Sequence, residues 1–299
     1  MNLRNKKILI TGGSGFIGSN LIKKLECLGA QVTVFDKSNG YDIQNEHQLI
    51  SMVKKKFDAI YHLAAFSGPT QSNLEKIKSF EINTLSTINL CQLIAKQSSG
   101  TKLIISSSRL EYGIPQYLPV DEKHPTKPTS VYGLSKLTAT QFAQMCYLKY
   151  NLDVCVFRTS NVYGPHNKQK FSGYNIINHF IDLALQNQTL KIYGNGNQRR
   201  DYIYVEDLVD VFISALVPKS SGQIYNLGYG RGIEFKEMVK LIIKKTGKGR
   251  IAYEKWPDNF ESVETGSYIS DIGKVKKELG FKPLVNFKTG IDKTLEQSL

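Results

Sequence analysis

Short apolar runs alternate with amphipathic segments along the first half of the chain. Runs typical of buried strands occur at 7–11, 31–35, 58–65, 101–106 and 152–157. Longer segments at 76–96 and 132–150 carry apolar residues at helical spacing. Because strands that alternate with helices form parallel sheets with both faces covered, we predict an α/β fold built on a doubly wound parallel sheet.

A glycine-rich turn joins the first predicted strand to the first predicted helix. Its glycines are spaced G-x-x-G-x-x-G, a variant of the dinucleotide-binding turn of Rossmann-type sheets. One glycine makes the turn, one lets the backbone approach a pyrophosphate, and one lets the helix pack closely on the strand. The phosphates of such a ligand bind N–H groups at the helix N-terminus. We therefore expect a dinucleotide to contact Gly12, Gly15, Phe16, Ile17 and Gly18.

The second predicted strand ends in an acid, Asp36, about twenty residues past the turn. A carboxylate at this position accepts hydrogen bonds from the adenosine ribose and repels a 2′-phosphate. The sequence therefore predicts NAD as the cofactor. NADP is the alternative, because the cation of the neighbouring Lys37 could meet a 2′-phosphate.

The pattern changes after Tyr163-Gly164-Pro165. A polar, irregular stretch at 166–173 precedes a predicted helix at 175–186, short strands at 190–193 and 202–205, and a helix at 206–216. We predict a Rossmann-type dinucleotide-binding domain over 1–165, to which a segment near 201–227 returns. Residues 166–200 and 228–299 are expected to form a smaller C-terminal α/β lobe that binds the substrate.

The bulk composition narrows the class of protein. The 299 residues are enough for one large or two modest domains. The chain has no run of the roughly 18 apolar residues needed to cross a bilayer, and its first apolar run is too short for a signal peptide. We therefore expect a cytoplasmic protein without a membrane partner. The four cysteines, Cys27, Cys91, Cys146 and Cys155, lack metal-ligand spacing, so no metal site is predicted.

The net charge of +13 raises the question of a nucleic-acid partner. The lysines are spread over predicted helix faces and do not form one basic arm, so we interpret them as a solvated surface. No nucleic-acid partner is expected. Their field would attract an anionic cofactor and an anionic substrate.

A tyrosine and a lysine are the candidate catalytic pair. Tyr132 and Lys136 are spaced i and i+4, which places both side chains on one side of a helix. A lysine cation favours the phenolate of a neighbouring tyrosine, and a phenolate can take a proton from a sugar or alcohol. The fourth predicted strand ends in three serines, where the reactive ring of the cofactor is expected. Ser108 could bind the same substrate oxygen.

These motifs resemble the extended short-chain dehydrogenase/reductases, and among them the nucleotide-sugar epimerase/dehydratase family typified by UDP-glucose 4-epimerase. The resemblance spans nearly the whole chain. Its marks are 11–18 (TGGSGFIG), 62–65 (HLAA), 106–108 (SSS) with 111–113 (EYG), 132–136 (YGLSK), 161–165 (NVYGP) and 200–207 (RDYIYVED).

The resemblance implies a role for each motif. Tyr132 would be the general base and acid, Lys136 its tuner and a ribose ligand, and Ser108 the second partner of the substrate oxygen. The other implied cofactor contacts are Asp42, Ile43, Leu63, Ala64, Ala65 and Asn83. The implied substrate contacts are Asn161 with the sugar or a phosphate, Asn175 and Arg200 with the diphosphate, and Lys191 and Tyr193 beside the nucleobase.

The chain departs from the family pattern in two places. The 4,6-dehydratases carry an Asp-Glu pair after the strand-end hydroxyl, whereas this chain has Arg109-Leu110, which disfavours water elimination. Epimerases of this type usually carry a late arginine on the diphosphate, where this chain has Glu261-Ser262-Val263-Glu264. Arg200 and Lys191 would then carry more of the phosphate charge.

The leading hypothesis is an NAD-dependent epimerase of a nucleotide-diphosphate sugar, acting at C4 through a transient 4-keto sugar. A nucleotide-sugar 4-ketoreductase is the alternative enzyme, and a decarboxylating relative comes third. A dinucleotide sensor or nucleic-acid-binding relative is the non-enzyme alternative. Members of the family are commonly homodimers through paired helices, for which 76–97 and 132–150 are the candidates.

Overall fold

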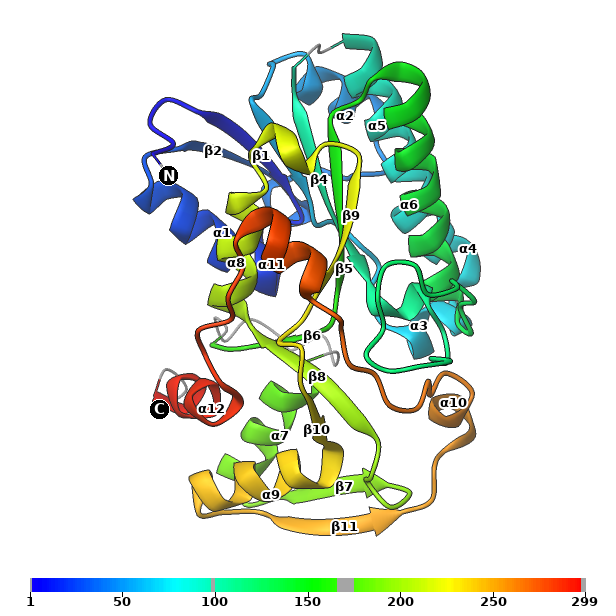
Figure 1. Ribbon diagram of the computed structural model, residues 1–299, viewed down its shortest axis with the longest axis vertical. Helices are drawn as coiled ribbons and strands as arrows, with labels where there is room; N and C mark the ends of the chain where they lie inside the picture. The colour runs from blue at the N-terminus through cyan, green and yellow to red at the C-terminus, as the bar shows by residue number, and fades with distance from the viewer. Residues whose placement is uncertain (1, 98–99, 166–174, 297–299) are drawn as a thin grey trace.

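The fold is that of a computed structural model, which describes residues 2–97, 100–165 and 175–296 (Figure 1). The predicted irregular stretch 166–173 lies outside the described residues. A six-stranded parallel sheet forms the upper part of the molecule in Figure 1. In sheet order its strands are β2 (Gln31–Phe35), β1 (Lys7–Thr11), β3 (Ala59–His62), β4 (Lys102–Ser108), β5 (Val154–Thr159) and β9 (Gln223–Leu227). The predicted doubly wound parallel sheet is therefore confirmed.

The order of the strands fixes where a ligand binds. The chain runs from β1 to β2 on one side and then continues on the other side with β3, β4 and β5. In open parallel sheets, ligands bind beyond the carboxyl ends of the strands at such a switch point. The register Thr11↔His62 and Ser108↔Thr159 places the last residues of neighbouring strands together at this edge.

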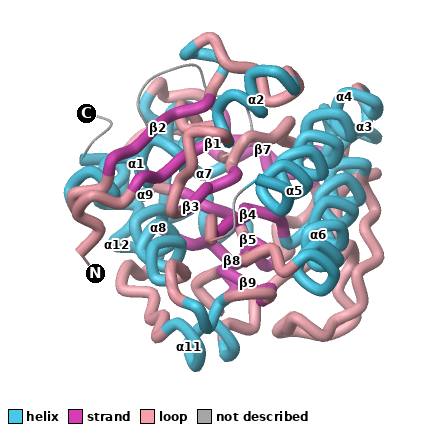
Figure 2. Tube along the Cα trace, turned by 90° about the horizontal axis from the view of Figure 1, so that it is seen from above, coloured by secondary structure: helices cyan, strands magenta, loops and turns pink. Residues whose placement is uncertain are grey.

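Helices cover both faces of the sheet, as the view from above shows (Figure 2). One face carries α1 (Phe16–Cys27), α8 (Val205–Ser214) and α11 (Gly273–Leu279), and the other carries α2 (Glu46–Val53), α5 (Ser86–Gln97) and α6 (Val131–Tyr150). Successive residues of β1 serve opposite faces, because side chains alternate along a strand. Ile8 and Ile10 pack under α1 and α8, whereas Leu9 packs under α2 and α5.

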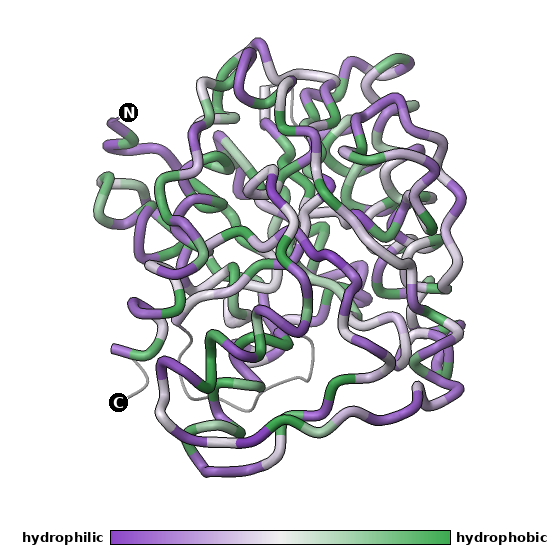
Figure 3. Tube along the Cα trace, turned by 60° about the horizontal axis from the view of Figure 1, so that its bottom comes forward, coloured by the Kyte–Doolittle hydropathy of each residue, from purple (hydrophilic) through white to green (hydrophobic). Residues whose placement is uncertain are grey.

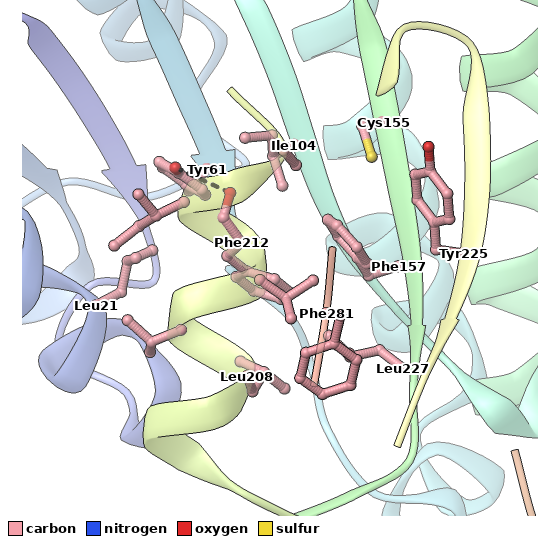
Figure 4. Close-up of a cluster of buried hydrophobic side chains, with 14 of the residues drawn as sticks. Leu21, Tyr61, Ile104, Cys155, Phe157, Leu208, Phe212, Tyr225, Leu227 and Phe281 are labelled. Carbon is pink, nitrogen blue, oxygen red and sulfur yellow. Dashed lines mark hydrogen bonds between the residues drawn. The ribbon is translucent and has the colours of Figure 1, made fainter. Parts of the chain in front are cut away.

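The core beneath α8 is rich in aromatic side chains (Figure 4). Phe212 of α8 stacks on Phe157 of β5 with ring centroids 5.0 Å apart, and Phe157 stacks in turn on Tyr225 of β9. The phenol of Tyr61 donates a hydrogen bond to the carbonyl of Phe212 at 3.2 Å. Full burial of one such side chain contributes about 1.5–3 kcal/mol, so this cluster fixes α8 firmly on the sheet.

The predicted helix at 76–96 is interrupted in the structure. It consists of α4 (Lys76–Phe80), a π-helical turn at Glu81–Leu85 and α5, and a short helix α3 (Pro69–Leu74) precedes it. π-helical turns inside helices often mark functional positions. Asn83 lies within this turn. Its side chain bonds outside the helix, which no apolar periodicity could indicate.

The smaller lobe lies below the carboxyl end of the sheet in Figure 1 and contains two small sheets. One pairs β10 (Gly232–Glu234), β8 (Arg199–Tyr204) and β6 (Asn161–Tyr163), and the other pairs β11 (Arg250–Glu254) with β7 (Thr189–Tyr193). The helices here are α7 (Ile176–Leu185), α9 (Phe235–Thr246), α10 (Asp258–Glu261) and α12 (Phe287–Glu296). Hydrophilic residues recur along the outer loops (Figure 3). The proposed domain boundaries stay a prediction.

No helix in the described ranges is both long enough and apolar enough to cross a membrane.

Candidate active site

Close backbone contacts shape the glycine-rich turn after β1. Gly12 has a φ of +71°, and a Cβ there would lie 2.6 Å from the amide nitrogen of Ala64. A Cβ on Gly18 would lie 2.6 Å from the carbonyl oxygen of Gly12. Both positions therefore require glycine. Helix α1 begins at Phe16, so the N–H groups of Phe16 and Ile17 belong to the first turn, which has no intrahelical acceptors for them.

The acid at the end of β2 faces this turn. Asp36 accepts a hydrogen bond from the amide of Ser14 at 3.2 Å, and one from the amide of Ser38 at 3.0 Å. The cation of Lys37 lies 3.0 Å from the carboxylate of Asp42. This ion pair directs the side chain of Lys37 toward Asp42. The next residue, Ile43, is buried in the same hydrophobic cluster as Phe35. A glycine cradle with a neighbouring carboxylate fits NAD, whose pyrophosphate and ribose these groups would hold.

His62 connects the ends of β1 and β3. Its Nδ1 lies 2.7 Å from the hydroxyl of Thr11, and its Nε2 lies 2.9 Å from the hydroxyl of Thr87. Burial, together with the charge of Lys136, lowers the pKa of His62 to about 3. The histidine of the HLAA motif is therefore neutral and joins two strand ends to α5.

The predicted contacts Leu63, Ala64 and Ala65 lie in the loop after β3. The amide of Ala64 donates to the Thr11 hydroxyl at 3.3 Å. Asn83 holds the next residue of this loop, because its Oδ1 accepts from the amide of Phe66 at 2.8 Å. Its Nδ2 donates to Ser135 of α6 at 3.0 Å. Asn83 therefore positions the loop against α6, the helix that carries Tyr132 and Lys136.

The three predicted catalytic residues come together at the end of β4 and the start of α6. Ser130 caps α6, because its hydroxyl accepts from the amide of Gly133 at 3.1 Å. Gly133 packs so closely that a Cβ there would overlap the carbonyl oxygen of Leu110. This approach brings Tyr132 within hydrogen-bonding reach of Ser108.

The pKa values differ from the simple expectation. Burial and the charge of Glu111 raise the pKa of Tyr132 to about 12. The hydrogen bond with Ser108 has the opposite effect on this pKa but is the smaller contribution. Burial lowers the pKa of Lys136 to about 8. The ammonium of Lys136 donates to the carbonyl of Ser106 at 2.9 Å. The expectation that Lys136 makes Tyr132 acidic is therefore not met in this structure, in which burial dominates both groups.

A buried carboxylate lies behind this site. Glu111 is fully buried and accepts hydrogen bonds from Ser107 and Thr140. Its second oxygen lies 2.7 Å from Nε of Arg158, and Arg158 donates to the phenol of Tyr112 at 2.9 Å. Sequence reasoning singled out Glu111 only as part of a motif, because two of its partners, Thr140 and Arg158, come from α6 and β5.

The predicted substrate residues lie in three places. Asn161 donates to the carbonyl of Asp201 at 3.0 Å, on the pairing of β6 with β8. Asn175 caps α7 through its Oδ1, while its buried Nδ2 has no hydrogen-bond partner among the described residues. Arg200 forms an ion pair with Glu264. These residues belong to β6, to the N-terminal cap of α7 and to β8, and their contact with one substrate stays a prediction.

The predicted nucleobase residues lie on β7. The ammonium of Lys191 lies 3.1 Å from Glu254 of β11. The ring of Tyr193 lies 5.5 Å from that of Trp256 and 5.7 Å from that of Phe260, measured between centroids. Sequence reasoning missed Trp256 and Phe260, because no local pattern joins them to a residue about 60 positions earlier.

The Rossmann-type sheet, the glycine cradle and the Ser-Tyr-Lys cluster define a dinucleotide-dependent enzyme of the dehydrogenase/reductase type. Residues 8–228 match the NAD dependent epimerase/dehydratase family. The chain is 33% identical over 303 residues to a putative UDP-glucose 4-epimerase of Methanocaldococcus jannaschii, across 96% of this chain and 97% of that protein.

Two further comparisons show the range of related proteins. The chain is 30% identical over 312 residues to UDP-glucuronic acid decarboxylase 1 of Xenopus tropicalis, across 97% of this chain and 71% of that protein. The crystal structure of the UDP-glucose 4-epimerase of Thermotoga maritima with UDP-glucose superposes with a TM-score of 0.90 at 27% identity, over 98% of both chains. The chain therefore belongs to the NAD-dependent epimerase/dehydratase family and uses NAD as its cofactor.

Proposed function

We propose that the protein is an NAD-dependent C4 epimerase of a nucleotide-diphosphate sugar. The observation that carries the proposal is the cluster of Ser108, Tyr132 and Lys136 without a carboxylic acid at the dehydratase positions. Bound NAD would supply the hydride chemistry, and the chain supplies binding, orientation and proton transfer.

Tyr132 acts at the C4 hydroxyl of the sugar. It takes the hydroxyl proton as the sugar is oxidised and returns a proton when the 4-keto sugar is reduced on its other face. The hydrogen bond between Ser108 and Tyr132 favours the phenolate form, and in the complex the Ser108 hydroxyl donates its one proton to the same sugar oxygen. Lys136, which bonds to the strand end at Ser106, holds the ribose of the cofactor beside this site.

The side chains that follow Ser108 favour epimerisation over dehydration. Arg109 is a cation, and Leu110 has no ionisable group. The next carboxylate, Glu111, is fully buried and is held by Arg158, so it cannot exchange a proton with a sugar. Water elimination needs an acid and a base beside the sugar. These three positions supply neither.

The lobe supplies a platform for the nucleobase. Tyr193, Trp256 and Phe260 form an aromatic cluster beside β7, and Phe260 is 43% exposed. An exposed ring can stack on a base. Because the similar enzymes of Methanocaldococcus jannaschii and Thermotoga maritima are described as UDP-glucose 4-epimerases, we propose a UDP-sugar as the first substrate to test.

The remaining expectations concern the cellular setting. We propose a cytoplasmic homodimer that pairs through α5 and α6. The absence of a nucleic-acid partner likewise stays a prediction.

The test is epimerisation by the purified protein. UDP-, GDP-, CDP- and dTDP-sugars are incubated with the enzyme, and epimers are separated by chromatography. We expect an equilibrium mixture of C4 epimers without net consumption of NADH. Tyr132→Phe should lower kcat by about 10²- to 10⁴-fold. Tyr147→Phe, on the same helix, is the matched control and should keep wild-type activity.

Reduction of a keto sugar at the expense of NADH, with no epimer formed, would establish the ketoreductase instead. Equal activity of Tyr132→Phe and the wild type would remove the proposed mechanism. Loss of carbon dioxide from a UDP-uronic acid would indicate the decarboxylating relative.

A further inference from the structure

Arg109 directs its side chain from the catalytic strand end toward a loop of the smaller lobe. Its Nη1 donates to the hydroxyl of Thr265 at 3.0 Å, and its guanidinium lies 5.3 Å from the ring centroid of Tyr268. Arg200 reaches the same loop from β8, where it pairs with Glu264 and donates to the carbonyl of Gly266. Two guanidinium groups therefore converge on one short loop.

The charge at this loop is unbalanced. Glu264 is ion-paired with Arg200 and also accepts from two backbone amides of its own loop. Burial, followed by the charge of Arg200, lowers the pKa of Arg109 to about 10, so Arg109 stays protonated at neutral pH. A guanidinium has five N–H donors. Among the described residues, the guanidinium of Arg109 donates one hydrogen bond, to Thr265. A surplus charge of this kind indicates an anionic ligand.

A buried phenol faces the same two cations. Tyr202 is 3% exposed, and its hydroxyl has no hydrogen-bond partner among the described residues. Burial raises the pKa of Tyr202, while the charges of Arg200 and Arg109 act against this rise. An unpaired buried donor destabilises a protein unless a ligand accepts its hydrogen bond. This hydroxyl is an independent indication that a ligand oxygen binds near the two arginines.

We propose that Arg109 and Tyr202 join Arg200 in binding the diphosphate of the substrate, an inference that rests on the proposed function. A nucleoside diphosphate brings the negative charge that the two guanidiniums lack, and its oxygens accept from planar N–H groups in pairs. Arg109 thereby supplies the second cation that the segment 261–264 does not provide. The residue that replaces a dehydratase acid becomes a substrate-binding residue.

Binding measured apart from catalysis tests this assignment. The NAD-saturated protein is titrated with UDP by calorimetry, and inorganic pyrophosphate is measured as a competitor because it carries no base. Arg109→Gln should weaken UDP binding about 10- to 100-fold, the effect of a lost charge-assisted hydrogen-bond pair. Tyr202→Phe should weaken it about 3- to 10-fold. Pyrophosphate should lose affinity in parallel.

Arg199→Gln is the matched control. Arg199 lies next to Arg200 on β8, but it is exposed and bonds to Ser267 and Tyr268 through its backbone, so this variant removes the same charge and leaves those bonds in place. It should bind UDP with wild-type affinity. The melting temperature separates binding from folding. Tyr202→Phe should keep or raise it, because the lost hydroxyl is buried without a partner in the described protein. Arg109→Gln should also keep or raise it, because it relieves repulsion from Arg200.

Wild-type affinity of Arg109→Gln for UDP would overturn the proposal, as would failure of the wild type to bind both UDP and pyrophosphate. A loss confined to UDP-glucuronic acid would assign Arg109 to a sugar carboxylate and would also overturn it. If UDP binding depends on Arg109 while no sugar is epimerised, the diphosphate site stands and the proposed function fails.

Discussion

Glu111 shows how a residue outside the proposed proton path can set its pH dependence. Its carboxylate is fully buried and is bound by Arg158, Ser107 and Thr140. Its negative charge raises the pKa of Tyr132 and also raises that of Lys136. Glu111 therefore affects both members of the Tyr-Lys couple in the same direction, although it is not expected to contact the sugar.

Glu111→Gln should shift the pH profile of kcat/KM to lower pH. Without the neighbouring negative charge, Tyr132 loses its proton at lower pH, so the acidic limb of the profile shifts to lower pH. Lys136 loses its proton at lower pH for the same reason, which moves the basic limb down. The variant should also lose about 3 kcal/mol in the free energy of unfolding, because Arg158 stays buried without a charged partner. Rate profiles and urea unfolding measure the two effects.

Glu122→Gln is the control for this shift. Glu122 is a partly buried carboxylate whose charge acts on Tyr112 and which bonds to the amide of Asn226. Its removal should leave both limbs of the profile where they are in the wild type. A Glu111→Gln profile that superposes on the wild-type profile would contradict the coupling.

At the scale of elements, the first turn of α6 determines whether the proposed catalytic residues meet. Gly133 follows Tyr132 in this turn, and it packs on the carbonyl of Leu110. Alanine has the higher helix propensity, by about 1 kcal/mol, so propensity alone would make Gly133→Ala stabilising. Steric overlap with a backbone carbonyl opposes this gain and pushes α6 away from the end of β4.

Gly133→Ala should therefore lower kcat by more than about 10-fold, because small displacements of a catalytic group are costly. The free energy of unfolding should change less, since the rest of α6 keeps its contacts with the sheet. Steady-state kinetics and thermal unfolding are compared with Thr138→Ala, a partly exposed position on the same helix. Thr138→Ala should stay within about 0.5 kcal/mol of the wild type. Full activity of Gly133→Ala would show that the close packing is dispensable.

The sequence predicts the elements best where one local pattern determines them. The strand before the glycine turn was predicted at 7–11, where the structure has β1, and the helix at 132–150 differs from α6 by one residue. The helix at 76–96 is predicted without its π-helical turn, because the partners of Asn83 in that turn lie far away in sequence. These partners, Phe66 and Ser135, are 17 and 52 positions away.

At the scale of the whole molecule, the site was predicted in parts. The proposed catalytic cluster follows from motifs at strand and helix ends, since parallel strands end at one edge of a sheet. The pairing of Arg200 with Glu264 joins positions 64 apart, and the contact of Arg109 with Thr265 joins positions 156 apart. A local pattern of hydrophobic residues cannot predict contacts between positions so far apart in the sequence. Burial, which reverses the expected pKa shift of Tyr132, likewise appears only when the fold is known.

The exposed face of α5 and α6 is the proposed surface for a second copy of this chain. The two helices lie side by side (Figure 2), and Thr84 of the π-helical turn before α5 donates to the carbonyl of Ser135 of α6 at 2.9 Å. Leu134 and Leu148 are fourteen residues apart on α6, so they lie on one face, and Leu85 belongs to the π-helical turn that precedes α5. All three are exposed, at 45%, 73% and 51% respectively. Apolar side chains gathered on neighbouring helices gain free energy by burial in a dimer.

Light scattering after gel filtration should give twice 33.7 kDa for the wild type at about 10 μM, a concentration that suits a dimer with sub-micromolar Kd. Leu85→Glu combined with Leu148→Glu should yield the monomer, because two buried carboxylates per subunit would face the twofold-related copy without partners. Leu284→Glu is the control, since Leu284 is 80% exposed but lies before α12. A monomeric wild type would contradict the proposed dimer. A double variant that stays dimeric would exclude this interface, because a twofold interface uses the same face of both subunits and the two substitutions would therefore change both sides of it.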